Sequence, residues 1–317
     1  MRALTPSSPT AAAAAAPRQQ PWLIHLKLVG MAALWGASWP CGRVLAQALP
    51  PLAAASWRFG MASLLLLLWL QRSGGLARLR GLTPRQWLGL TAAGCIGVYG
   101  YAMFFMFGLV HVAAGRASLV VTTNPVLTAL IASWWLGERL NWKIGLGMAL
   151  ATAGAVMVMT HGAPWTLLSG ALGTGELLLL GCVVAWVAYT LIARRVLVGI
   201  DAVTTTAVTA TIGMSMLLVS SLLFEGPGAL LSPLHASATV WAALVFIAVV
   251  ATVVAYAWYF EGVASLGAGA AAGYISLVPV FGVVFATLWL GEALDASIIV
   301  GGLLAVGGMV IMNAARR

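Results

Sequence analysis

Two stretches of the chain carry nearly the same six residues. Residues 135–140 read WLGERL, and residues 289–294 read WLGEAL. Extending this match at a constant shift of 154 residues aligns 108–158 with 262–312 without a gap, with 18 identities in 51 positions. The chain therefore contains two copies of one unit, and the arrangement of these copies decides the fold.

The match continues toward the start of each copy. At a shift of 151 residues four further pairs are identical: Gly30 with Gly181, Trp35 with Trp186, Ala37 with Ala188 and Arg43 with Arg194. We predict a first repeat over 25–161 and a second over 173–314. Residues 1–24 are rich in Ala, Pro and Ser, which predicts a disordered cytoplasmic tail.

The composition places both repeats in a lipid bilayer. The 317 residues are 62% hydrophobic and 7% charged, whereas about 25% of the residues of soluble domains are charged. At about 20 residues per span, the length allows roughly ten membrane helices. We predict an all-α polytopic membrane protein with spans near 26–47, 51–70, 86–108, 113–136, 143–160, 174–193, 201–223, 238–260, 267–290 and 298–314.

The basic residues orient these ten spans. Lys and Arg accumulate in short cytoplasmic loops, and 13 of the 16 basic residues fall in the tails or in loops on one side. Both termini are therefore predicted to be cytoplasmic. Because each repeat holds five spans, an odd number, the second copy enters the membrane from the opposite face. Inverted repeats are typical of secondary transporters with a central site.

Several motifs also resemble those of a known family. These motifs are Trp35-Gly36-Ala37-Ser38, Trp57-Arg58-Phe59, the Pro-Val pairs at Pro125 and Pro279, and the two LGExL endings. They resemble the EamA family of the drug/metabolite transporter superfamily. The resemblance implies two inverted five-helix repeats in a bacterial-type inner membrane and export of amino acids or other small metabolites. The second repeat departs from the pattern, since it has no counterpart of Arg58 and no basic residue in its LGExL loop.

Aromatic side chains at repeat-related positions are candidates for a substrate cavity. Trp35 and Trp39 share a helix face, as do Trp186 and Tyr189. Tyr99 and Tyr256 are the deepest aromatics of spans three and eight, which completes the aromatic candidates. An aromatic wall suits an aromatic or neutral amino acid. The alternative is packing against lipid or at the membrane interface.

Polar residues and prolines at membrane depth extend this candidate site. Thr122, Asn124 and Ser276 could contact a substrate, or they could form interhelical hydrogen bonds instead. Pro125 and Pro279 each remove a helix hydrogen bond and are candidates for a hinge or kink. A kink needed only for static packing is the alternative.

One arginine lies at a costly depth. Arg58 is predicted about 10 Å into span two, so it is a candidate partner for a substrate carboxylate unless it reaches the surface. Arg43 and Arg116 lie nearer the end of their spans, and we expect both to extend toward the surface.

Coupling to protons is disfavoured because acidic residues fall in loops or at span ends, and Glu261 lies at the cytoplasmic end of span eight. We predict facilitated diffusion by alternating access, with a proton-coupled drug/metabolite antiporter as the alternative. A channel or an intramembrane enzyme is a further alternative of another class. The chain carries no nucleophile, paired-acid or metal motif, so we expect no enzyme, cofactor, metal or nucleic-acid partner.

A monomer suffices to enclose the cavity, and dimerisation is left open.

Overall fold

The computed structural model describes residues 21–136, 141–167 and 172–315, and in these residues it contains helices and connecting turns with no strand. In the first half the elements are α1 (Pro21–Ala48), α2 (Pro51–Arg72), α3 (Leu76–Leu79), α4 (Pro84–Ala93), η1 (Gly94–Gly100), α5 (Tyr101–His111), α6 (Ala114–Val120), η2 (Val121–Thr123), α7 (Asn124–Leu136), α8 (Trp142–Met159) and η3 (Pro164–Leu167). In the second half they are α9 (Thr174–Val196), α10 (Ala202–Phe224), α11 (Pro227–Leu231), η4 (Ser232–His235), α12 (Ala238–Val245), η5 (Phe246–Val254), α13 (Ala255–Leu266), α14 (Ala268–Gly273), η6 (Tyr274–Leu277), α15 (Val278–Leu290) and α16 (Ala296–Ala315).

Nine helical rods of the described chain are long and apolar enough to cross a membrane. They are Pro51–Arg72, Pro84–His111, Ala114–Trp134, Trp142–Met159, Thr174–Val196, Ala202–Phe224, Ala238–Leu266, Ala270–Leu290 and Ala296–Ala315. The first predicted span corresponds to α1, which is helical over 28 residues but is not among these nine. Its Trp35, Trp39, Pro40 and Arg43 lower its hydropathy. The prediction of an all-α polytopic membrane protein is confirmed, with nine qualifying rods instead of ten.

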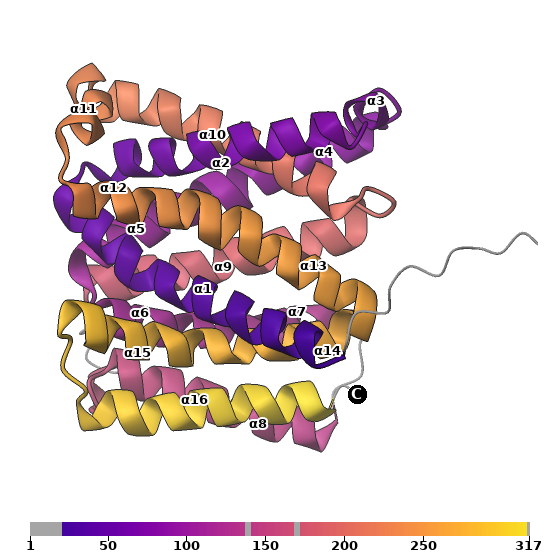
Figure 1. The fold of residues 1–317 in the computed structure, drawn as a ribbon. Helices are drawn as coiled ribbons and strands as arrows, with labels where there is room; N and C mark the ends of the chain where they lie inside the picture. Colours follow the sequence, from indigo (N-terminus) through magenta and orange to yellow (C-terminus); the bar gives the residue numbers. More distant parts are fainter. Residues whose placement is uncertain (1–20, 137–140, 168–171, 316–317) are drawn as a thin grey trace, which may run out of the picture.

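The two ends of the bundle are defined by the chain termini. Helix α1 begins and α16 ends at the same end (Figure 1), which we call the termini side; the other end is the opposite side. Helix α1 already begins at Pro21, so residues 21–24 are helical and the rest of the predicted tail lies outside the described residues. The Gly137-Glu138 loop also lies outside them.

Close helix contacts depend on glycines. Helices α8 and α16 run side by side (Figure 1), and Gly154 of α8 faces the backbone of Gly301 and Ala305 of α16. Gly147 and Gly308 form the next contact along the same pair. A hydrogen in place of a side chain lets the two backbones approach, as in membrane helix pairs with small residues at their interface.

Both repeats interrupt their helices at matching places. The third rod of each repeat contains a π-helical segment, η1 or η5, and the fourth contains a 3₁₀ segment, η2 or η6. Pro125 and Pro279 are each the second residue of the helix that follows the 3₁₀ segment. Proline lacks an N–H donor and is tolerated in the first turn of a helix, so each proline sits where the hydrogen-bond ladder restarts.

Candidate substrate cavity between the repeats

A cavity of about 330 Å³ lies inside the bundle and draws its walls from both repeats. Its lining residues are Trp35, Ser38, Trp39, Arg58, Tyr101, Phe105, Val121, Thr122, Asn124, Pro125, Thr128, Trp186, Thr190, Ala251, Thr252, Tyr256, Ala272, Ile275, Ser276, Val278, Pro279, Met309 and Asn313. The volume is in the range of small-molecule sites.

The cavity extends from the middle of the bundle toward the termini side. Asn313 lies two residues before the end of α16, which ends on that side. Arg58 and Phe105 lie at the other extreme of the lining. Arg58 is in the half of α2, and Phe105 in the half of the rod Pro84–His111, that is nearer the opposite side. A solute entering from the termini side would therefore reach Arg58 last.

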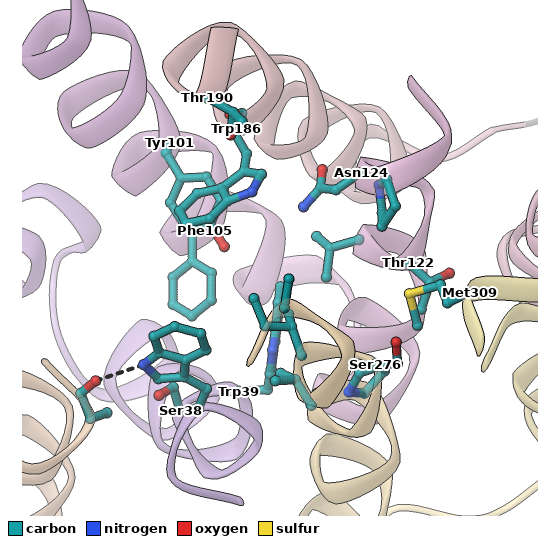
Figure 2. Close-up of a pocket in the computed structure, with 18 of the residues that line it drawn as sticks. Ser38, Trp39, Tyr101, Phe105, Thr122, Asn124, Trp186, Thr190, Ser276 and Met309 are labelled. Carbon is teal, nitrogen blue, oxygen red and sulfur yellow. Dashed lines mark hydrogen bonds between the residues drawn. The ribbon is translucent and has the colours of Figure 1, made fainter. Parts of the chain in front are cut away.

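Aromatic rings form one wall of the cavity. Trp39 and Phe105 lie with ring centroids 5.0 Å apart, and Tyr101 and Trp186 lie 5.9 Å apart. Figure 2 shows Tyr101, Phe105 and Trp186 together on one side of the space. Tilted ring pairs at these separations are favourable and present flat apolar surface to a ligand.

A second aromatic cluster joins the repeats. The Trp35 ring meets the Tyr256 ring edge-on at 5.2 Å, and its Nε1 donates a hydrogen bond of 2.9 Å to the backbone oxygen of Ala251 in η5. Trp35 belongs to the first repeat and the other two residues to the second. The side chain of Trp35 thus connects the first-repeat wall of the cavity to η5 and α13 of the second repeat.

Polar side chains form the facing wall, and most of them are already hydrogen-bonded. Thr122 Oγ1 donates to the backbone oxygen of Leu119 at 2.6 Å, and Asn313 Nδ2 donates to Ser276 Oγ at 2.8 Å. Figure 2 shows Thr122 and Ser276 on the side of the cavity away from Tyr101 and Trp186, and Asn124 beside the Trp186 ring. Asn124 differs from its neighbours because its Oδ1 is buried and has no hydrogen-bond partner.

Arg58 is the one charged residue in the described lining. Its guanidinium carbon lies 4.9 Å from the ring centre of Phe59 and 5.3 Å from that of Phe105. Its Nε and Nη1 atoms are buried without a hydrogen-bond partner. A buried guanidinium whose N–H groups have no acceptor is unfavourable, and it can bind a negatively charged group.

The structure brings most of the sequence-predicted site residues together. Ten of them line this single cavity: Trp35, Trp39, Arg58, Thr122, Asn124, Pro125, Trp186, Tyr256, Ser276 and Pro279. Tyr99 and Tyr189 are not among the lining residues. Tyr99 is hydrogen-bonded to Ser220 of α10 at 2.9 Å, and the Tyr189 ring packs on Gly97.

Tyr101, and not the predicted Tyr99, supplies an aromatic ring of this rod to the cavity, because depth alone does not tell which face a residue occupies. A π-turn holds an extra residue, so side chains after η1 point in directions that a regular helix would not give them. Tyr101 and Phe105 follow η1 and face the cavity at i, i+4 spacing. Asn313 was also missed, although a lone amide in the last apolar segment is a signal that the sequence does contain.

The other two arginines at membrane depth are satisfied by protein groups. Arg43 donates to the backbone oxygen of Leu109 and, at 3.1 Å, to that of Val112. Arg116 is 5% exposed and its Nη2 lies 2.5 Å from Asp295. The expectation that Arg116 extends to the surface is therefore wrong, because a carboxylate distant in sequence pairs with it.

Carboxylates hold the two repeats together at the opposite side. Glu292 accepts hydrogen bonds from the backbone amides of Ala114 and Gly115, at 2.7 and 2.9 Å, where α6 begins. A carboxylate at a helix N-terminus is favoured by the unpaired amides and the helix dipole. This contact joins the segment after α15 to the start of α6 at that side of the bundle.

Asp295 lies at the same side of the bundle and also links the two repeats, through its ion pair with Arg116. Burial alone raises the pKa of Asp295, but hydrogen bonds from Ser297 and Ile298 and the charge of Arg116 outweigh it and lower this pKa to about 2. The carboxylate is therefore ionised at neutral pH and can pair with Arg116.

Acidic and histidine side chains do not contribute to the described cavity lining. Glu261 forms an ion pair with Lys27 between α13 and α1, and His25 Nδ1 is 2.5 Å from the hydroxyl of Tyr274. Among the described residues there is also no group of three His, Cys, Asp or Glu side chains that could hold a metal ion.

Comparison with known proteins gives one family. The model of the EamA-like transporter family matches residues 22–160 and again residues 173–314. A solved crystal structure, described only as that of a protein, superposes with a TM-score of 0.64 at 20% identity and covers 92% of this chain and 98% of that chain. At this identity the likeness concerns the fold alone.

Curated relatives are transporters. "Uncharacterized transporter YyaM" of Bacillus subtilis is 26% identical over 93% of this chain and 94% of its own length. An uncharacterized transporter of Archaeoglobus fulgidus is 28% identical over 92% of this chain and 97% of its own length. A protein of Streptantibioticus cattleyicolor described as "Probable terminal-alkyne amino-acid exporter" is 27% identical, over 71% of this chain and 72% of its own length.

Proposed function

Because the chain belongs to the EamA-like transporter family of multi-pass membrane proteins, we propose that it exports neutral amino acids, above all aromatic ones, or closely related small metabolites. Export proceeds by alternating access across the inner membrane, with both termini and the termini side of the bundle in the cytoplasm. Helix α1 acts as the tenth span. One chain holds the whole cavity, so a monomer is sufficient.

The aromatic cavity between the repeats is the observation that carries this proposal. About 330 Å³ enclosed by Trp, Tyr and Phe rings with a few polar groups suits one small molecule with an apolar or aromatic body. The relative described as an amino-acid exporter agrees with this substrate class.

Alternating access is favoured by the repeats and by the positions of their breaks. Two inverted copies can exchange conformations around a fixed central site. The 3₁₀ segments before Pro125 and Pro279 are weak points in two cavity-lining rods, where bending costs few hydrogen bonds. With Glu292 closing the opposite side, the described conformation is assigned as inward-facing.

Transport is assigned as facilitated diffusion. A proton-driven transporter needs a titratable group that both sides of the membrane reach in turn. The described lining offers no Asp, Glu or His for this role, and Glu261 is paired with Lys27. The concentration of the solute in the cytoplasm then drives its exit.

Counterflow in liposomes tests the proposal. Purified protein is reconstituted in liposomes loaded with an unlabelled amino acid, and uptake of the labelled amino acid is followed with and without a pH gradient. We expect saturable exchange of phenylalanine, tryptophan or other neutral amino acids that does not depend on the gradient. Exchange that requires the gradient would favour the proton-coupled drug/metabolite antiporter, and exchange of none of these amino acids would exclude the substrate class.

A further inference from the structure

Arg58 is the arginine at membrane depth that keeps buried guanidinium nitrogens without a hydrogen-bond partner in the described structure. Arg43 donates to backbone oxygens and Arg116 pairs with Asp295, whereas Nε and Nη1 of Arg58 are buried with no hydrogen-bond partner. Burying a cation without an acceptor is unfavourable. Its position in the cavity wall means that a bound molecule can supply the missing acceptor.

The surroundings of Arg58 define the geometry of that acceptor. The rings of Phe59 and Phe105 lie against the guanidinium, with centroids 4.9 and 5.3 Å from its carbon. Such contacts use the face of the guanidinium, while its N–H bonds lie in the plane of the group. A planar carboxylate matches these in-plane donors and can accept two hydrogen bonds at once.

The charge of the lining limits the ligand to one negative group. Among the described lining residues Arg58 is the only cation, and no carboxylate neutralises it. A doubly charged phosphate ester would leave a negative charge unpaired in the cavity, which is costly. A single carboxylate pairs with Arg58, and the ammonium group of a zwitterion then needs neutral acceptors in the lining.

Asn124 supplies a hydrogen-bond acceptor without a partner, whereas Arg58 supplies donors without a partner. Its Oδ1 is a buried acceptor without a donor. Arg58 is seven residues after the start of α2, and Asn124 is ten residues after the start of α6, and both helices begin at the opposite side (Figure 1). At 1.5 Å per residue, Asn124 lies about 5 Å farther from the start of its rod than Arg58 does from the start of α2, in the direction of the termini side.

We propose that Arg58 binds the carboxylate and Asn124 Oδ1 accepts a hydrogen bond from the ammonium group of a zwitterionic α-amino acid. This assignment rests on the proposed transport function and adds to it the groups that recognise the substrate. The carboxylate sits deepest, the ammonium group lies toward the termini side, and the aromatic rings contact the side chain. A charge pair is stronger than a hydrogen bond to a neutral amide, so losing the carboxylate costs more affinity than losing the ammonium group.

Three ligands with one phenyl ring separate these contributions. Binding of L-phenylalanine, 3-phenylpropionate and 2-phenylethylamine to the full chain in detergent is measured by isothermal titration calorimetry. We expect affinity to fall in that order. An amine that binds more tightly than the acid would overturn the assignment of Arg58, and binding of none of the three would overturn the whole proposal.

Substitutions assign the groups. In Arg58→Gln the affinity for phenylalanine should fall about 30-fold or more, and the preference for the acid over the amine should disappear. Arg58→Lys should keep that preference. Asn124→Ala should weaken phenylalanine about 10-fold and leave 3-phenylpropionate unchanged. Arg43→Gln is the matched control, because Arg43 is outside the cavity, and it should keep the wild-type order.

The results distinguish this proposal from the function beneath it. If Arg58→Gln still prefers the acid, or if Asn124→Ala weakens both phenylalanine and the acid equally, the corresponding contact is wrong even when counterflow succeeds. If the wild-type order holds but phenylalanine shows no counterflow, recognition is right and the transport function fails. Should Arg58→Gln not fold, Arg58→Lys and the wild-type order still decide the role of the cation.

Discussion

The indole Nε1 of Trp35 in α1 donates a 2.9 Å hydrogen bond to the backbone oxygen of Ala251 in η5, which ties the first repeat to the π-helical segment of the second. Both residues line the cavity. Trp186, the repeat partner of Trp35, contacts the rings of Tyr101 and Tyr189 and forms no indole hydrogen bond within the described structure. The two tryptophans are thus related by sequence and unlike in bonding.

This asymmetry predicts opposite effects of one substitution at two sites. Trp35→Phe keeps an aromatic ring and loses the bond to Ala251, so it should reduce the population of the described conformation. A cysteine at Ala272, which lines the cavity, reports this as slower labelling by a membrane-impermeant maleimide from the termini side. The reporter cysteine is introduced into a variant in which the native Cys41, Cys95 and Cys182 are replaced.

Trp186→Phe is the matched control. If the inverted repeats exchange conformations, we expect Trp186 to take the role of Trp35 in the other conformation and to bond to η1. Its loss should then leave labelling at Ala272 unchanged or make it faster. Equal slowing in both variants would mean that the tryptophans act only through ring packing.

The glycine contacts between α8 and α16 predict a stability difference within one helix. A methyl group at Gly154 would meet the backbone of Gly301 and Ala305, whereas a methyl group at Gly145 meets nothing within 4 Å. Gly154→Ala should therefore cost about 1–3 kcal/mol, and Gly145→Ala should stabilise the helix by up to about 1 kcal/mol. Thermal unfolding in detergent measures both, and similar Tm values would contradict the close approach.

Asp295 predicts a loss of stability in acid. Its pKa is lowered from 3.8 to about 2 in the folded protein, so its contribution is complete above the unfolded pKa and is lost as the pH falls from about 4 to 2. Since the side chain is 47% exposed, solvent screening limits this contribution to about 1 kcal/mol. The substitution Asp295→Asn should lower Tm at pH 7. Below pH 4 the Tm of this variant should fall less than the Tm of the wild type. Parallel curves for the two proteins would rule out this role.

Cysteine labelling tests the orientation in the membrane. With the termini in the cytoplasm, a cysteine at Ala293 should react with an impermeant maleimide added to intact cells, and one at Gly81 should react only after lysis. The basis is the absence of Lys and Arg from residues 291–297 and the presence of Arg78, Arg80 and Arg85 around Gly81. The reverse pattern would place the termini outside.

The cavity was largely accessible to prediction because its lining follows from local patterns and from the repeat. Trp35 and Trp186, and Thr122 and Ser276, are repeat partners, and all four line the same space. Depth along the span predicts Tyr99 but does not tell which face of the helix a residue occupies, and it is Tyr101 that lines the cavity. The partners of Arg116 were hidden for another reason, since Asp295 is 179 residues away along the chain.

The sequence by itself determined the membrane environment, the helical class, the two copies of one unit and the residue types available to a central site. These follow from hydropathy over about 20 residues and from spacing along the chain, which are local properties. Only the tertiary structure decided which polar groups are satisfied. It gave Arg43 and Arg116 their partners, left Nε and Nη1 of Arg58 and Oδ1 of Asn124 without a hydrogen-bond partner, and set Trp35 against Ala251. Those outcomes depend on contacts between helices distant in sequence.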